Sequence, residues 1–86
     1  MFYTYILYSI KDNLLYTGYT KDLKQRIENH NNGEIKSTMN RRPLKLIYYE
    51  ACLNQQDATR REKYLKSGNG KIFLKNRLSK YWSKSK

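Results

Sequence analysis

The sequence contains few of the residues that cross-link or bend a small domain. Its 86 residues include one cysteine, Cys52, and one proline, Pro43. A single cysteine cannot form an internal disulfide, and the chain does not begin with the basic, apolar and small-residue segments of a signal peptide. We therefore expect one domain over residues 1–86 that is held by its own core and located in the reducing cytoplasm.

Long apolar runs and acidic side chains are also scarce. Lysine or arginine recurs so often that no stretch approaches the ~18 apolar residues of a membrane-spanning helix. Only 7 aspartates and glutamates oppose 18 lysines and arginines, which leaves a net charge of +11. A field of this sign attracts polyanions, so we expect nucleic acid as the partner, no membrane partner, and a monomer by default.

The positive charge is concentrated towards the C-terminus. Residues 1–50 hold 8 basic and 5 acidic side chains, a net charge of +3, whereas residues 51–86 hold 10 and 2, a net charge of +8. The C-terminal third is therefore the part that we expect to face a polyanion. The alternative is a generally basic, solvated surface with no particular partner.

Tyrosine is abundant, and it marks the expected strands. Residues 2–9 and 14–19 are dense in aromatic and β-branched side chains, and the polar residues 11–13 between them favour a turn. This pattern predicts a β-hairpin, and residues 44–50 predict a third strand. If the hairpin pairs residues whose numbers sum to an odd value, Tyr5 and Tyr16 project from the same face of the sheet.

A first helix is expected directly after the hairpin. Thr20 can cap a helix that begins at Lys21, and the Asn-Asn-Gly sequence at 31–33 ends it. Arg26 and His30 lie four positions apart in this helix and are therefore neighbours on its surface. Both side chains can reach one site. The segment that follows this helix reads as a polar loop over residues 36–42.

A second helix is expected from its cap, Asn54, to a stop at Gly68. Within it Glu62 occupies the apolar stripe, where a carboxylate needs a partner or a metal ion. A third helical segment follows Gly68, and residues 81–86 read as a frayed basic tail.

These side chains form the set that hydrolysis of a phosphodiester requires. The reaction needs an activated water, stabilisation of charge on the phosphate oxygens and help for the leaving oxygen. Arg26 offers a planar, permanently charged pair of donors for phosphate oxygens, and a tyrosine or His30 can take or relay a proton. Glu62 can hold one Mg²⁺ or Mn²⁺, because Mg²⁺ binds through one or two carboxylates and retains several waters.

Each of these residues also has an ordinary structural interpretation. Most of the 9 tyrosines are expected to be strand and core side chains whose hydroxyls reach water. Arg26 alone is typical of a solvated helix arginine, and His30 alone is typical of a partly buried residue with backbone partners. Glu62 alone could pair with a lysine or arginine of the third helical segment. The order and spacing of the whole set therefore carry the prediction.

The order of the motifs is more specific than any one of them. It runs through Tyr3-Thr4-Tyr5, Tyr16-Thr17-Gly18, the stretch from Thr20 to Arg26, His30, Arg41-Arg42-Pro43 and the stretch from Arg61 to Lys66. This ordered set resembles the GIY-YIG nuclease superfamily, in particular its small stand-alone members related to the N-terminal nuclease domain of the excinuclease C subunit. The resemblance covers about residues 2–80. It implies an α/β (α+β) fold in which a small three-stranded antiparallel sheet is flanked by about three helices, in the order β-β-α-β-α-α.

The resemblance implies a role for each residue of the set. Tyr5 ends the first signature triplet and Tyr16 begins the second, and one of these phenols acts as or orients the general base. Arg26 stands at the position of the family's transition-state arginine, His30 where members have a tyrosine or histidine, and Glu62 at the metal-binding glutamate. We expect the nucleic acid to be contacted by seven basic residues, which are Lys24, Arg41, Arg42, Lys66, Lys71, Lys75 and Arg77.

The chain departs from the family pattern in two respects. The first triplet has Tyr3 and Thr4 in place of glycine and isoleucine, and the second has Thr17 in place of isoleucine or valine. Larger members also carry an asparagine after the glutamate, and the corresponding position here is Leu74, with Asn76 and Asn69 as imperfect substitutes.

The leading prediction is a metal-dependent DNA endonuclease. The resemblance implies a role in DNA repair or recombination, and RNA stays open as a substrate. The main alternative is a non-catalytic nucleic-acid-binding module that retains the fold, which the missing asparagine favours. A structural protein associated with RNA or the ribosome fits the charge but leaves Glu62 unexplained.

Overall fold

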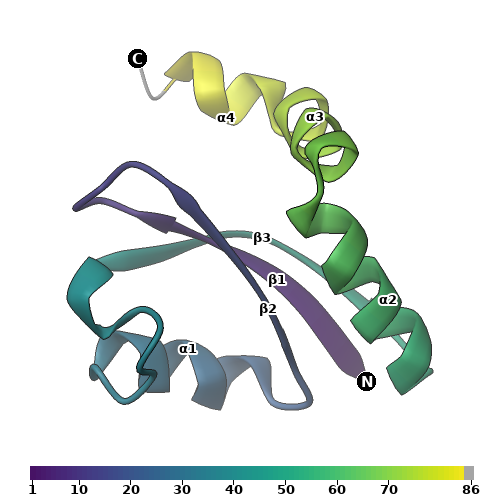
Figure 1. The fold of residues 1–86 in the computed structure, drawn as a ribbon, viewed down its shortest axis with the longest axis horizontal. Helices are drawn as coiled ribbons and strands as arrows, with labels where there is room; N and C mark the ends of the chain where they lie inside the picture. Colours follow the sequence, from purple (N-terminus) through teal and green to yellow (C-terminus); the bar gives the residue numbers. More distant parts are fainter. Residues whose placement is uncertain (85–86) are drawn as a thin grey trace.

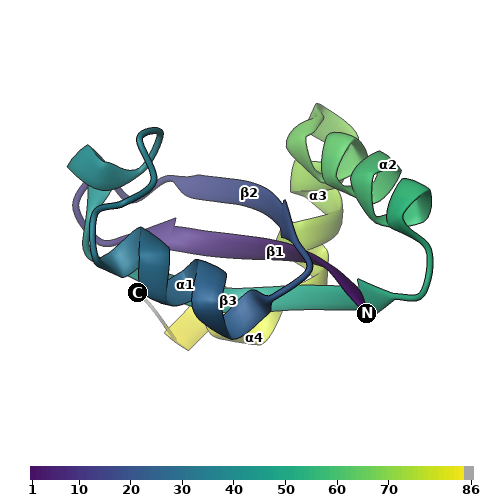
Figure 2. The same ribbon diagram turned by 90° about the horizontal axis from the view of Figure 1, so that it is seen from below.

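The computed structural model describes residues 1–84. Three strands, β1 (Phe2–Ser9), β2 (Leu15–Thr20) and β3 (Leu44–Cys52), form one antiparallel sheet in the order β2-β1-β3. The helices are α1 (Leu23–Asn31), α2 (Gln55–Lys66), α3 (Gly68–Arg77) and α4 (Ser79–Lys84), with a 3₁₀ turn η1 (Met39–Arg41) before β3. Helix α1 covers one side of the sheet, and α2, α3 and α4 lie on the other (Figure 1, Figure 2). The predicted fold class and element order are confirmed.

The hairpin has the predicted register. Tyr5 pairs with Gly18 and Leu7 pairs with Tyr16, so the numbers of each pair sum to an odd value. Because strand side chains alternate between faces, these residues project towards α1, and Ile6 projects towards α2 and α3. The two signature tyrosines, Tyr5 and Tyr16, therefore lie on the same side of the sheet.

The sheet separates two apolar clusters. Under α1, the buried side chains of Tyr5, Leu7 and Leu44 pack against partly buried neighbours from α1, β2 and β3. On the other face, the buried side chains are Ile6, Leu65 and Leu74. A β-bulge in β3 opposite Ile6 and Leu7 inserts Ile47, and both Ile47 and Tyr48 pack in this second cluster.

Helix α1 begins two residues later than predicted. Its cap is Asp22, whose carboxylate accepts a hydrogen bond from the Gln25 backbone N–H at 3.1 Å. Thr20 instead accepts from the backbone N–H of Asp22 at 3.1 Å, so it orients the cap and does not form it. The end of the helix is as predicted, with Asn31 as its last residue. Asn54 caps α2 as predicted.

The junction between α2 and α3 differs from the predicted stop at Gly68. Gly68 is the first residue of α3, and Ser67 alone joins the two helices. The Ser67 hydroxyl donates to the Tyr64 carbonyl at 2.5 Å and accepts from the Gly70 N–H at 3.2 Å. A Cβ atom on Gly70 would overlap the Tyr64 carbonyl oxygen, so the turn requires glycine at this close approach.

The C-terminal segment is more ordered than the predicted tail. Residues 81–84 form the end of α4, and the Trp82 ring packs edge-on against Tyr8 with 6.2 Å between ring centroids. Residues 85–86 of the expected tail lie outside the described residues. Over residues 1–84, no helix has the length and apolar character needed to cross a membrane.

Candidate active site

The candidate site is built around the hydroxyl of Tyr5 in the central strand. Tyr5 is fully buried, and its hydroxyl lies 2.7 Å from His30 Nε2. The same oxygen accepts a hydrogen bond from Arg26 Nε at 3.2 Å. Arg26 and His30 project from successive turns of α1, in line with their four-residue spacing. One phenol thus joins the two polar residues of the helix.

Gly18 provides the space that Tyr5 occupies. It lies opposite Tyr5 in the β1–β2 ladder, and a Cβ atom at this position would overlap the ring and hydroxyl of Tyr5. Only glycine leaves the phenol free to lie across β2 and reach α1. The glycine of the second triplet is therefore required by the tyrosine of the first.

The hydrogen bonds around His30 favour one tautomer. Arg26 Nε–H donates to the Tyr5 oxygen, and His30 Nε2 lies 2.7 Å from that oxygen as an acceptor for the Tyr5 O–H. In this arrangement His30 Nδ1 carries the ring proton and donates to Thr38 Oγ1 at 2.7 Å. Burial, assisted by the charge of Arg26, lowers the His30 pKa to about 4. The imidazole is therefore neutral at neutral pH.

Thr38 is a member of the site that the sequence did not reveal. It immediately precedes η1 in the segment expected to be a polar loop, and its side chain is fully buried against His30. A threonine in a polar loop gives no periodic signal, because its burial depends on how the loop folds back over α1. Arg26, Tyr5, His30 and Thr38 form one continuous hydrogen-bonded row.

Tyr16 lies beside this row and is only partly buried. Its ring centroid is 6.4 Å from that of Tyr5 and 5.2 Å from that of His30. The Ser37 hydroxyl donates to the Tyr16 hydroxyl at 3.5 Å. The hydrogen bond to Tyr5 is the main factor that raises the pKa of Arg26, and Tyr16 adds to it. Arg26 therefore interacts with both phenols.

Glu62 lies on α2 and is linked to this site only through its charge. Its side chain is 22% exposed, and its carboxylate pairs with Lys66 Nζ at 3.3 Å, one helical turn later. Burial is the main factor that raises the pKa of Tyr5, a hydrogen bond from Arg26 opposes it, and the negative charge of Glu62 adds to the rise. The partner of Glu62 thus lies on α2 itself and not on the third helical segment. Its charge is within electrostatic range of Tyr5.

Two of the expected nucleic-acid contacts have structural partners. Arg41 forms an ion pair with Asp12 at 2.6 Å and also donates to backbone carbonyls of the hairpin. Arg42 donates from Nε to the Met39 carbonyl at 2.9 Å, and its guanidinium lies over Gly33. These bonds give Arg41 and Arg42 roles in holding the loop before β3. Their contact with nucleic acid stays a prediction.

The other five expected contacts lie on the surface. These exposed side chains are Lys24, Lys66, Lys71, Lys75 and Arg77. Lys66, Lys71 and Lys75 line two adjoining cavities beside β2. Burial and the neighbouring Glu50 raise the pKa of Tyr48, and the charge of Arg77 opposes this rise. The charge of Arg77 also contributes to the lowered pKa of Glu50.

The sheet, the arginine-bearing helix and the two tyrosine triplets are the features of a GIY-YIG domain. The family described as the GIY-YIG catalytic domain matches residues 1–77. The chain therefore belongs to the GIY-YIG family, a nuclease family, and the resemblance seen in the sequence is confirmed.

Within this family the chain is similar to proteins named UPF0213. It is 47% identical over 77 residues to the UPF0213 protein in the ldhD 5' region of Pediococcus acidilactici, which covers 86% of this chain and 78% of the relative. It is 49% identical over 67 residues to UPF0213 protein CPE1444 of Clostridium perfringens, with 77% and 71% covered. The solution NMR structure of UPF0213 protein BH0048 from Bacillus halodurans matches with a TM-score of 0.52 and 38% identity, over 86% of this chain and 82% of that one.

Proposed function

We propose that the protein is a metal-dependent endonuclease that hydrolyses phosphodiester bonds of DNA. The observation that carries the proposal is the hydrogen-bonded row of Arg26, Tyr5 and His30, on a chain with a net charge of +11. An arginine with a purely structural role commonly pairs with a carboxylate. Arg26 is instead oriented by a neutral phenol, and so its charge is available to an anion.

Arg26 binds the phosphate in this proposal. Its Nε donates to Tyr5, and its two Nη nitrogens, beside Tyr16, can form the paired hydrogen bonds that a guanidinium makes with phosphate oxygens. Such donors stabilise developing charge best when they are fixed before the reaction, and Tyr5 fixes this one. Tyr5 and His30 are then positioning residues, because neither side chain is exposed.

Tyr16 is the phenol that meets the attacking water. The Tyr5 hydroxyl is enclosed between Arg26 and His30, whereas Tyr16 is partly exposed and lies beside both Tyr5 and His30. Tyr16 can therefore accept a hydrogen bond from the water and orient it towards the phosphorus.

Glu62 is the residue that would hold a divalent metal ion. Mg²⁺ binds through one or two carboxylates and completes its shell with waters and phosphate oxygens, so one glutamate within electrostatic range of Tyr5 fits this need. Among the described residues, no group of three or more His, Cys, Asp or Glu side chains could hold a further ion. Lys66 would release the carboxylate on metal binding. When bound, such an ion neutralises phosphate charge and lowers the pKa of a coordinated water.

A cleavage assay with single-stranded, duplex and branched DNA in Mg²⁺ or Mn²⁺ tests the proposal. Arg26→Ala and Glu62→Gln should each reduce the cleavage rate by about 100-fold or more, because each removes a group that acts on the reacting phosphate. Matched changes at exposed positions, Arg60→Ala and Glu28→Gln, should leave the rate unchanged; the Arg60 side chain is 78% exposed.

Three outcomes are informative beyond the rate itself. If the wild-type protein cuts none of these substrates, or if Arg26→Ala and Glu62→Gln cut as fast as wild type, the proposed mechanism is wrong. Preference for branched DNA would support a role in repair or recombination. Faster cleavage of the matching RNA substrates would instead assign the activity to RNA.

A nucleic-acid-binding module without turnover is the second candidate. The position of the family's late asparagine is Leu74, and its side chain is buried in the apolar cluster with Ile6 and Leu65. The protein therefore has no side-chain amide at the position of the family's asparagine. Binding without cleavage should weaken steeply with salt, because each phosphate contact releases about 0.7 to 0.9 counterions. A complex that persists unchanged in high salt would count against this candidate.

A further inference from the structure

We infer that a groove along β2 binds a single-stranded polynucleotide segment beside the candidate active site. The inference rests on the proposed function for its direction, because it names the strand that would lie beside the site. Binding in the groove is nevertheless separate from cleavage, and it can be measured without metal.

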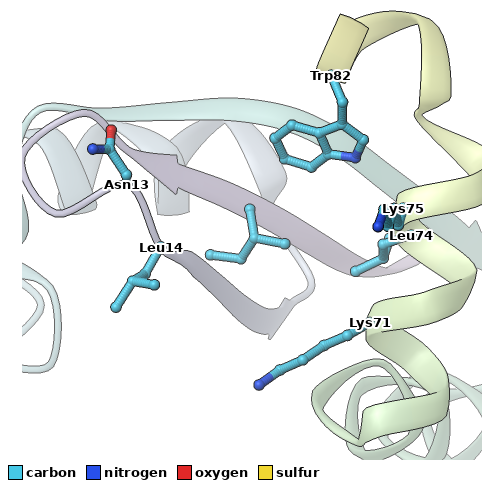
Figure 3. Close-up of a pocket in the computed structure, with 7 residues that line it drawn as sticks. Asn13, Leu14, Lys71, Leu74, Lys75 and Trp82 are labelled. Atoms are coloured by element: carbon cyan, nitrogen blue, oxygen red, sulfur yellow. The ribbon is translucent and has the colours of Figure 1, made fainter. Parts of the chain in front are cut away.

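The groove consists of two adjoining cavities that share Leu15, Lys71 and Leu74. The larger has a volume of about 540 Å³ and lies between the hairpin tip and α3 and α4, as Figure 3 shows. It is lined in addition by Asn13, Leu14, Lys75 and Trp82. The smaller has a volume of about 230 Å³ and is lined in addition by Tyr16, Thr17, Leu65 and Lys66. The volume of the larger cavity lies within the range of ~300–1,000 Å³ that is typical of ligand-binding sites.

The smaller cavity brings the groove to the edge of the sheet beside the candidate site. Tyr16 and Lys66, the ion-pair partner of Glu62, form part of its wall. The cavity lies on the face of the sheet that carries Leu65 and Leu74, whereas the Tyr16 ring packs on the face covered by α1. Because β2 is the edge strand, a polynucleotide in the groove runs beside Lys66 and along the edge that separates it from the Tyr16 phenol.

The groove has the chemistry that unpaired nucleotides require. Lys66, Lys71 and Lys75 place three exposed ammonium groups along its wall, and the aliphatic side chains of Leu14 and Leu15 form an apolar floor. Single-stranded nucleic acid binds where cations track the backbone and an aromatic ring stacks on a base. Bases in an intact duplex are already stacked and paired, so a duplex cannot use such a ring.

Trp82 supplies that ring. Its indole packs edge-on against Tyr8 at 6.2 Å and against Tyr81 at 5.0 Å between ring centroids. It projects from α4 and lines the larger cavity (Figure 3). Trp82 lies beyond the segment matched by the GIY-YIG family, which ends at residue 77.

The single tryptophan of the chain makes the groove directly measurable, because its fluorescence reports only on this position. Short oligo-dT and oligo-U are titrated into the protein in EDTA, which prevents metal-dependent cleavage. Single-stranded oligonucleotides should quench the emission to saturation. A blunt duplex at the same phosphate concentration should not, and a comparison of oligo-dT with oligo-U shows whether the sugar is read.

A matched pair of variants separates the groove from general charge effects. Leu14 and Ile72 are 62% and 60% exposed, and only Leu14 lines the groove. Leu14→Glu should weaken binding of a labelled oligonucleotide by roughly tenfold, because it places a like charge beside the phosphates. Ile72→Glu should change affinity by less than about twofold.

The salt dependence gives a second test. Lys71→Gln should reduce the slope of log K against log salt by about 0.7, the value for one phosphate contact of a single strand. Lys21→Gln removes the same charge from the opposite end of β2 and should leave the slope unchanged.

The inference fails if single strands do not quench Trp82, or if Leu14→Glu and Ile72→Glu weaken binding equally. Quenching by a fatty acid but not by oligonucleotides would also overturn it and would assign the groove to an apolar anion. Cleavage without quenching would leave the proposed function standing without the groove. Quenching without cleavage would leave the groove standing and remove the proposed function.

Discussion

Gly18 and Tyr5 face each other across β2 and β1, and the missing side chain of Gly18 is the space that the Tyr5 phenol fills. The same phenol bonds to Arg26 and His30 on α1. Gly18 of β2 therefore determines, through Tyr5, where the Arg26 guanidinium of α1 lies.

This relationship predicts the effect of Gly18→Ala. The added methyl group would displace the Tyr5 ring and break its bond to His30, so we expect a loss of about 1–3 kcal/mol in the free energy of unfolding, measured with denaturant. Gly68→Ala is the matched control, because a Cβ atom there meets no other heavy atom within 4 Å. If Gly18→Ala were as stable as wild type, the Tyr5 ring would have to adopt another position without loss of stability, which would contradict this prediction.

Thr38→Val tests the far end of the hydrogen-bonded row. Valine fills the same volume but cannot accept the His30 Nδ1–H, which leaves a buried donor unsatisfied at a cost of about 1–3 kcal/mol. The ¹⁵N chemical shifts of the imidazole should report a change in tautomer population, which lost packing alone would not cause. Thr38→Ser keeps the hydroxyl and should restore the wild-type shifts. Unchanged shifts in Thr38→Val would contradict the positioning role.

The low pKa of His30 predicts acid sensitivity. Its pKa falls from 6.5 in the unfolded chain to about 4 in the fold, so between these values the unfolded state binds more protons. Stability from this group is complete above pH 6.5 and is lost as the pH falls towards 4, by up to about 3 kcal/mol. Denaturant unfolding between pH 4 and 7 measures it, with the pKa of His30 followed by NMR. His30→Gln should have a flatter profile than wild type, and parallel profiles would rule His30 out as the cause.

Arg41 offers a test between a structural and a binding role. Its hydrogen bonds hold the pKa of Asp12 at about 2, below the usual 3.8, so this contribution to stability is present above pH 3.8 and is lost as the pH falls towards 2. Arg41→Gln should raise the Asp12 pKa and lower stability, while the salt dependence of nucleic-acid binding stays the same. A slope reduced by about 0.7 to 0.9 would instead identify Arg41 as a phosphate contact.

The parts of the fold that depend on local periodicity could be predicted from the sequence. Alternation along the strands places Tyr5 and Tyr16 on one face, and the spacing of Arg26 and His30 brings both to the Tyr5 hydroxyl. The predicted start of α1 was wrong, because Thr20 and Asp22 are both good capping residues. Only the conformation of the backbone in the fold selects between them.

The features that depend on contacts between distant segments could not be predicted. Thr38 is buried because the loop after α1 folds back over His30, and a polar loop sequence carries no sign of this. Residues 81–84 of α4 were predicted as part of a tail because the chain ends in alternating serine and lysine, yet Trp82 packs against Tyr8 at the other end of the chain. The ion-pair partner suggested for Glu62, a lysine or arginine of the third helical segment, was wrong, because Lys66 lies one turn away on α2 itself.

Ser67 is the single residue between α2 and α3, and its backbone is extended, with φ −77° and ψ 169°. Glu62 and Lys66 lie on α2, whereas Lys71 and Lys75 lie on α3. The dihedral angles of one residue therefore determine how the carboxylate of α2 is placed relative to the lysines of α3. One residue inserted at this joint would change the direction in which α3 leaves α2, and the distance between the carboxylate and those lysines would change with it.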